Sequence, residues 1–297
     1  MGISAKIIAD SIAKDTRKRL TTMTVRLPRY ILAELNTHRM FSRNSASSRA
    51  IPVKKMIEQV KLDPVIPNRW GKNQPGMVAQ EELTGETLQA AKDRWLRARD
   101  SAVEHAEALV ELGLHKEVSN RILESWMWTV SIITATEWGN FYNLRCHPAA
   151  QPEMRVLAEA MWAAQDASIP RELDEGDWHL PYVTEDDKEA LMDMHDDAFF
   201  KNEVPYPRFV KNHEFYLQKL SVARCARVSY LNHDGTTPNY AKNIELHDRL
   251  LKDGHASPFE HQATPSPSHS LVPPGNLLGF TQYRKLLPNE NRTEYKR

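Results

Sequence analysis

Between residues 38 and 49 the chain places arginines among short hydrogen-bonding side chains. The segment reads HRMFSRNSASSR, and five basic residues but no acidic one occur between Glu34 and Glu58. Guanidinium groups beside hydroxyl and amide donors suit a phosphate or pyrophosphate, because their planar N–H forks match its oxygens. A solvated basic loop has the same composition, so composition alone leaves both interpretations open.

A second segment, residues 143–155, reads NLRCHPAAQPEMR and follows an apolar stretch. Arg145 lies just before a predicted helix, where it can face a pocket or pair with an acidic residue of that helix. Cys146 stands beside His147, and these are the residue types of a nucleophile and its base. Adjacent side chains usually point apart, and a cysteine in an apolar stretch is more often a core residue. We therefore expect no nucleophilic role for Cys146.

The third segment, residues 254–261, reads GHASPFEH and combines two imidazoles, a hydroxyl and a carboxylate around a Pro-Phe turn. Loops of this kind carry functional side chains more often than cores do. Its spacing is not that of a Ser-His-Asp triad, so the sequence does not support hydrolase chemistry. His179, Asp193 and His195 do not follow a metal-ligand spacing either, and we expect no metal site.

Together these segments resemble the signatures of the flavin-dependent thymidylate synthase family. The family has an Arg-His-Arg triplet followed by Ser, Asn, Ser and Arg, and residues 37–49 match it except at Thr37. Its Gly-His-x-Ser-Pro-Phe-Glu-His block is present at 254–261, its Leu-Arg and Ala-Gln-x-Glu blocks at 144–155, and its Ala-Arg-Val-Ser-Tyr segment at 226–230. In the family this histidine block precedes the Arg-His-Arg block, whereas here it comes last. The motif order therefore resembles a circular permutation.

The resemblance implies an α+β fold with a mixed sheet and long helices, and an FAD enzyme. In the family, NADPH reduces the flavin and methylenetetrahydrofolate supplies a one-carbon unit to C5 of a pyrimidine deoxynucleotide, with dUMP the expected substrate. Thr37 stands where the family has arginine, and Ser45 where it usually has glutamate. Both positions border the nucleotide in the family. Hydroxymethylation of dUMP or dCMP therefore stays open as an alternative.

The resemblance also assigns roles to individual residues. The expected cofactor contacts are His38, Arg39, Ser42, Asn44, Asn140, His255 and Ser257. The expected nucleotide contacts are Ser47, Arg49, Arg121 and Arg145. Arg145 matches the arginine that favours ionisation of the pyrimidine N3, since a fixed cation lowers such a pKa. It is therefore the expected catalytic residue. Family members are homotetramers whose sites combine residues of several subunits, and the same assembly is expected here.

Local patterns predict the elements that position these segments. Residues 20–27 place apolar residues among threonines, which predicts a strand, and Pro28 suits the start of a helix over 29–37. Helical spacing predicts a long helix over 86–112 that ends at Gly113. Its apolar stripe suits packing within the chain and packing between subunits equally well. The stripe consists of Leu88, Ala91, Trp95, Ala98, Ala102, His105, Leu109 and Leu112.

Further sequence patterns predict the remaining elements and the division of the chain into parts. Helical spacing predicts helices over 149–165 and 240–253, while residues 221–230 suit a strand or a buried turn. Residues 172–197 hold eleven acidic residues and one basic residue, which indicates an acidic connector or lid. We expect a flavin- and nucleotide-binding core with a helical insertion, this connector, and a second part of the core with the histidine block. Their respective ranges are 1–170, 171–215 and 216–297.

Composition excludes several classes of protein. The 297 residues include 39 basic and 39 acidic ones, and 41% are hydrophobic, which excludes wholesale disorder. Zero net charge argues against a generally cationic nucleic-acid binder. A non-catalytic nucleic-acid-binding protein, with Trp126 and Trp128 stacking on bases, is the alternative from another class. Glycine motifs of Rossmann or P-loop type are absent. Two cysteines without a CxxC pair, and no signal peptide or membrane-length apolar run, predict a cytoplasmic protein.

Overall fold

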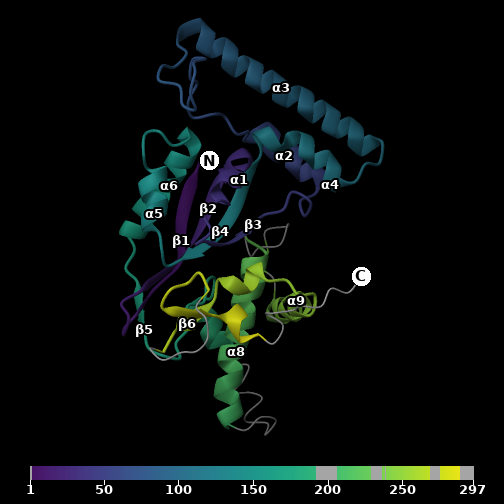
Figure 1. Ribbon diagram of the computed structural model, residues 1–297. Helices are drawn as coiled ribbons and strands as arrows, with labels where there is room; N and C mark the ends of the chain where they lie inside the picture. The colour runs from purple at the N-terminus through teal and green to yellow at the C-terminus, as the bar shows by residue number, and fades with distance from the viewer. Residues whose placement is uncertain (1, 192–205, 229–235, 238, 268–274, 288–297) are drawn as a thin grey trace.

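The computed structural model describes residues 2–191, 206–228, 236–237, 239–267 and 275–287. Figure 1 shows the arrangement of its elements. The strands are β1 Ser4–Ala13, β2 Arg19–Pro28, β3 Ser42–Ser45, β4 Trp128–Ala135, β5 Arg171–Leu173, β6 Ala263–Pro265 and β7 Phe280–Gln282. The α-helices are α1 Leu32–Leu35, α2 Val53–Leu62, α3 Gly85–Glu111, α4 Lys116–Ser119, α5 Gly139–Arg145, α6 Pro152–Asp166, α8 Tyr206–Ala226 and α9 Tyr240–Lys252. The 3-10 helices are η1 Arg29–Ile31, η2 Asn120–Trp126, η3 Ser257–Glu260 and η4 Tyr283–Leu286.

A five-stranded mixed sheet with the order β3-β4-β2-β1-β5 forms the centre of the fold. Strands β3, β4, β2 and β1 pair antiparallel, whereas β5 pairs parallel with β1 (Figure 1). The expected α+β class with a mixed sheet and long helices is therefore confirmed. The strand predicted over 20–27 is β2, and the helix predicted to follow it is present as η1 and α1.

The two faces of β2 have different partners, because side chains alternate along a strand. Met23, Val25 and Leu27 are fully buried and belong to the hydrophobic core formed with α5 and α6. On the opposite face, the hydroxyl of Thr22 is hydrogen-bonded to Nε2 of His179 at 2.8 Å. The strand is thus buried on both sides, with one apolar face and one hydrogen-bonded face.

Helix α3 is the predicted long helix, and it lies apart from the sheet with α2 and α4 between them (Figure 1). The chain leaves it at Gly113, which has a φ of 80°. The predicted stripe is not the main packing face: Val103 and Ala106 are buried, whereas His105 and Leu112 are exposed. Because each residue turns a helix by about 100°, packing centred on Val103 rotates much of the stripe away from the core.

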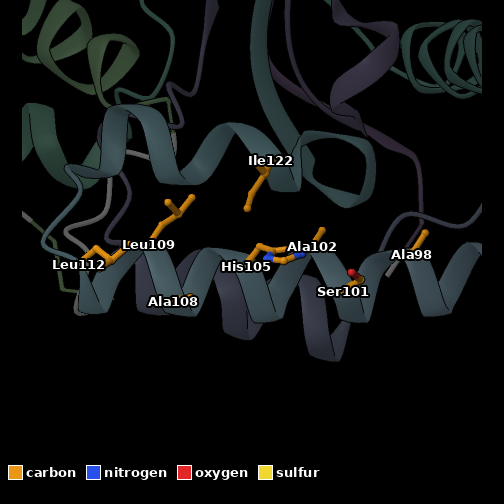
Figure 2. Close-up of a pocket in the computed structure, with 8 residues that line it drawn as sticks. All are labelled: Ala98, Ser101, Ala102, His105, Ala108, Leu109, Leu112 and Ile122. Carbon is orange, nitrogen blue, oxygen red and sulfur yellow. The ribbon is translucent and has the colours of Figure 1, made fainter.

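The exposed part of the stripe lines an open groove. Figure 2 shows its side chains, which include His105, Leu109 and Leu112 of α3, opposite Ile122 of η2. Leu112 is 81% exposed. Of the two interpretations of the stripe, packing within the chain therefore accounts for only part of it.

Helices α6 and α9 confirm the predictions over 149–165 and 240–253, and α9 ends just before Gly254. The prediction of a strand or turn over 221–230 was wrong for residues 221–226, which continue α8. Alanine and arginine favour a helix here, and the preceding turns of α8 extend it. The predicted burial of this segment is correct, since Val222 and Cys225 are fully buried.

The acidic segment contributes to the core as well as to the surface. It supplies β5, and the N–H of His179 donates to the carbonyl of Ala263 at 2.8 Å. The buried pair of Asp187 and Arg224 is joined by hydrogen bonds of 2.5 and 2.8 Å. Residues 192–205, which include Asp193 and His195, lie outside the described residues. The three-part division of the chain stays a prediction.

Among the described helices, none combines the length and the apolar character that a bilayer crossing requires.

Candidate active site

The basic loop leaves α1, and His38 is packed at its start. The imidazole ring lies 4.8 Å from the ring of Phe141 and 5.8 Å from that of Phe41, measured between centroids. Burial, with the cations of Arg145 and Arg43 beside it, lowers the pKa of His38 to about 4. The imidazole is therefore neutral at pH 7, and its Nε2 can accept a hydrogen bond.

Arg145, the last residue of α5, reaches back to this histidine and to α1. Its Nε donates to Nε2 of His38 at 2.9 Å, and its NH1 group pairs with the carboxylate of Glu34. The side chains of Arg145 and Glu34 are 21% and 30% exposed. Sequence reasoning missed Glu34, although it is the last acidic residue before the basic loop.

The histidine block comes last among the motifs, yet it packs against the strand that carries Asn44. The hydroxyl of Ser257, at the start of η3, donates to Oδ1 of Asn44 at 3.4 Å. The amide nitrogen of Asn44 donates to the carbonyl of Cys225 at 2.7 Å. Three segments that are far apart in the sequence therefore meet at β3, the edge strand of the sheet.

Ser42, the first residue of β3, is covered by residues near the end of the described chain. Its hydroxyl accepts hydrogen bonds of 3.0 Å from the side-chain amides of Asn276 and Gln282. Asn276 also donates to the carbonyl of Met40, and Gln282 to that of Glu260. These two amides, which sequence reasoning missed, join the basic loop to the histidine block and leave Ser42 1% exposed.

Behind the site, hydrogen bonds connect the histidine block to the sheet. Nδ1 of His261 is bonded to Thr134 at 2.8 Å, Thr134 to Thr22 at 2.7 Å, and Thr22 to His179 at 2.8 Å. Nδ1 of His179 is bonded to Ser11 at 2.9 Å. All five residues are buried, and burial lowers the pKa of each histidine to about 3. Both imidazoles are therefore neutral at pH 7.

The expected nucleotide contacts Ser47 and Arg49 lie on the exposed turn that follows β3. The side chain of Asn120, in η2, donates to the carbonyl of Ser48 at 2.8 Å and fixes η2 beside this turn. Arg121 follows directly, is exposed, and pairs with an acidic residue three positions further on at 2.8 Å. The structure therefore brings the segments of Arg49 and Arg121 together.

Three of the expected cofactor contacts are open to solvent. Arg39, Asn140 and His255 are exposed, and within the described residues their side chains form no hydrogen bond. Burial lowers the pKa of the neighbouring Arg43, while the carboxylate of Glu260 opposes this shift and the cation of Arg39 adds to it. The N–H groups of these two arginines can receive an anionic ligand.

Trp126 and Trp128 do not form a stacking platform. Trp126 is 9% exposed, and its ring centroid lies 5.6 Å from that of Trp95. The ring of Trp128 is covered by the guanidinium of Arg26 at 3.9 Å, and its Nε1 donates to the carbonyl of Asp63 at 2.9 Å. Both rings are used in packing, which disfavours the alternative in which they stack on nucleic-acid bases.

Burial raises the pKa of the Cys146 thiol, which disfavours the thiolate that a nucleophile needs. In the part of the chain that the structure describes, no three His, Cys, Asp or Glu side chains are placed to hold a metal ion.

Fold and site together define an α+β protein with arginines, amides and hydroxyls gathered at one edge of a mixed sheet, an arrangement suited to an anionic ligand. The family model described as thymidylate synthase complementing protein matches residues 19–171, more than half of the chain. The chain therefore belongs to this family. The match includes the basic loop and Arg145, whereas the histidine block lies beyond it.

Several solved structures are similar to this chain. One is a UMP/dUMP methylase, PolB from Streptomyces cacaoi, bound with 5-Br dUMP: it is 18% identical over 55% of this chain and 89% of that chain, with a TM-score of 0.46. Another is the flavin-dependent thymidylate synthase ThyX from Helicobacter pylori complexed with FAD and dUMP. It is 21% identical over 49% of this chain and 67% of that chain, with a TM-score of 0.35. No curated protein matches the chain.

Proposed function

We propose that this protein is a flavin-dependent enzyme that transfers a one-carbon unit to C5 of a pyrimidine deoxynucleotide. The observation that carries the proposal is the meeting of three motifs at β3 and α5. Arg145 contacts His38, and Ser257 of the histidine block contacts Asn44. Membership of the thymidylate synthase complementing protein family agrees with this activity. dUMP is the substrate that the sequence resemblance implies.

The donors at this edge fit FAD. A pyrophosphate needs cations and N–H or O–H donors. Arg39 supplies an exposed guanidinium, and Asn44 and Ser257, which are hydrogen-bonded to each other, line the same edge. Ser42 is too deeply buried to touch a cofactor and would support the site from behind. The residues that would hold or support FAD are His38, Arg39, Ser42, Asn44, Asn140, His255 and Ser257. Reduced FAD would supply the hydride, with NADPH as the reductant and methylenetetrahydrofolate as the carbon donor.

The nucleotide would bind between the turn after β3 and the end of α5. Arg49 and Arg121, with the hydroxyl of Ser47, would hold its phosphate, because exposed guanidinium groups on adjacent segments match phosphate oxygens. Arg145 would face the pyrimidine ring and act as the catalytic residue. The fold joins the α5 segment to the basic loop through His38, which would keep the ring near the cofactor residues.

We also propose that the chain forms a homotetramer, in which the apolar stripe of α3 packs against another copy. The stripe is only partly used within the chain, and Leu112 is 81% exposed. Burying a leucine side chain contributes roughly 1.5–3 kcal/mol, so a continuous stripe favours association.

The experiment that tests the proposed function is product analysis. The purified protein is incubated with FAD, NADPH, methylenetetrahydrofolate and either dUMP or dCMP, and the nucleotides are measured by mass spectrometry. A methyl product and a hydroxymethyl product differ by one oxygen atom, so the same spectrum identifies the reaction. We expect a C5-modified nucleotide that requires methylenetetrahydrofolate and FAD, and a methyl product requires NADPH as well, because only the methyl group needs a hydride. Unmodified nucleotide in the presence of bound FAD would contradict the proposal.

A further inference from the structure

The guanidinium of Arg145 is fixed through two of its three nitrogens. Its Nε donates to His38 at 2.9 Å, and its NH1 group pairs with Oε1 of Glu34. Within the described residues, NH2 of Arg145 and Oε2 of Glu34 have no hydrogen-bond partner, and both side chains are partly exposed. The pair therefore presents an acceptor at one end of a row of donors.

We propose that this pair recognises cytosine, so that dCMP is the preferred nucleotide and Glu34 determines the specificity. The inference rests on the proposed function, since it takes Arg145 as the residue that faces the pyrimidine ring. The N3 of cytosine carries no proton to lose, so with dCMP the role of Arg145 is to bind and orient the ring rather than to ionise N3. The outer edge of cytosine carries the N4 donor, followed by the acceptors N3 and O2. The matching protein edge is an acceptor followed by two donors. Glu34, whose Oε1 pairs with NH1 of Arg145, can supply this order with its Oε2 beside the NH1 and NH2 groups. Carboxylates accept from N4 of cytosine in the same way in DNA recognition.

Uracil matches the same pair poorly. Its outer edge places the N3 donor between the acceptors O4 and O2, and the matching protein edge is an acceptor between two donors. Glu34 lies at the end of the row, so O4 of uracil would face carboxylate oxygen, or N3–H would face a guanidinium N–H. Ionisation of N3 removes the second conflict but makes O4 more negative beside the carboxylate. Glu34 also offsets the charge by which Arg145 would favour that ionisation.

Among the described residues, the groups around the pair do not restore a donor or a further cation beside Glu34. Thr37, which stands where the family has arginine, uses its hydroxyl to donate to the backbone carbonyl of Glu34 at 2.7 Å. His38 is neutral at pH 7, because burial and the nearby arginines lower its pKa to about 4. The NH1 group of Arg43 donates to the backbone carbonyl of His38 at 2.6 Å. The cation that pairs with the carboxylate of Glu34 is thus Arg145.

Calorimetric titration of the full-length, FAD-supplemented protein with dCMP and with dUMP tests this inference. We expect dCMP to bind on the order of tenfold tighter, the discrimination typical of one mismatched base contact. In Glu34→Gln the carboxamide can turn its NH2 group toward O4 of uracil, so the ratio of the two affinities should fall or reverse. Glu159→Gln is the matched control, because Glu159 forms an exposed ion pair with Arg155 on α6. This variant should keep the ratio of the unchanged protein.

Tighter binding of dUMP than of dCMP to the unchanged protein would overturn the inference and leave the proposed function intact. An unaltered ratio in a folded Glu34→Gln variant would also overturn it. The ratio in the unchanged protein decides the matter even if the variant does not fold. Binding of neither nucleotide would contradict both the preference for cytosine and the proposed pyrimidine substrate.

Discussion

Arg145 connects three parts of the candidate site through one side chain. It extends from the end of α5 to His38 in the basic loop and to Glu34 in α1. Hydrogen bonds between ionised partners are shorter and stronger than neutral ones, and a guanidinium fixes their directions. The residue can therefore hold the loop in place and still present its remaining N–H groups to a ligand.

Substitution of Arg145 should separate turnover from cofactor binding. We expect Arg145→Ala to lower kcat by about 100-fold or more, since it removes a donor aimed at the reacting ring. FAD should stay bound, because Asn44 and Ser257 lie on β3 and η3. The measurements are product formation and the flavin absorbance of the purified variant. Arg155→Ala, which removes an exposed arginine of α6, is the control. Full activity in Arg145→Ala would rule out the catalytic role.

Substitution of Arg49 should act on nucleotide binding alone. Loss of a charge-assisted hydrogen bond to phosphate costs roughly 1.5–3 kcal/mol, so we expect Arg49→Ala to raise the nucleotide KM by about tenfold or more. The value of kcat should change little, because the phosphate does not react. Steady-state kinetics measure both values, with Lys54→Ala as a control at a nearby exposed cation. An unchanged KM would indicate that Arg49 is structural.

At the scale of elements, buried hydrogen bonds join the histidine block to the sheet. The bonds from His261 through Thr134 and Thr22 to His179 cross β4 and β2. A buried polar group without a partner costs about 1–3 kcal/mol, so this arrangement favours one alignment of the block on the sheet. The last motif in the chain is thereby fixed beside elements from its first half.

These two histidines should make stability depend on pH. Burial lowers their pKa values to about 3 from an unfolded value of 6.5, so the folded state binds fewer protons. Their full contribution is present above pH 6.5 and is lost as the pH falls toward 3. The expected loss is about 1.4 kcal/mol per pH unit for each histidine, measured by urea unfolding at several pH values.

The histidine variants provide the comparison. His179→Gln should show a shallower loss of the free energy of unfolding between pH 6.5 and 5, whereas His115→Gln, at an exposed site, should match the unchanged protein. Equal slopes in His179→Gln and the unchanged protein would mean that the acid sensitivity arises elsewhere.

Sequence patterns predicted the elements whose periodicity is local. Strand β2 and helices α3, α6 and α9 have apolar spacing within one segment, and the motifs identified the basic loop and the histidine block. The contacts between segments could not be predicted in this way. Glu34 and Arg145 are 111 positions apart, and Ser42 and Asn276 are 234 apart. Such pairs depend on the path of the whole chain, which periodicity does not report.

At the scale of the whole molecule, one face of α3 packs within the chain, and we propose that another face packs against a second copy. Val103 and Ala106 face the rest of the chain, whereas Leu112 and His105 lie on the open groove (Figure 2). A long helix that stands apart from the sheet can contact another subunit without disturbing β3. Assembly can therefore be tested by substitutions in α3, away from the residues assigned to the site.

A charge in this groove should disrupt the assembly. We expect the unchanged protein to have the mass of a tetramer by light scattering, and Leu112→Glu to give a smaller species, because the charge would have to be buried at the interface. Ile169→Glu, at a residue that is 93% exposed outside α3, should leave the mass unchanged. A monomer in the unchanged protein, or a tetramer in a folded Leu112→Glu variant, would contradict the proposed role of the stripe.

The central claim is that the three segments that meet at β3 form a flavin site, and an absorbance spectrum tests it most directly. The purified protein is recorded with and without added FAD, then after NADPH, and again after exposure to air. The account predicts flavin bands that stay with the protein, bleach with NADPH and return in air. A colourless protein that takes up no FAD would contradict it.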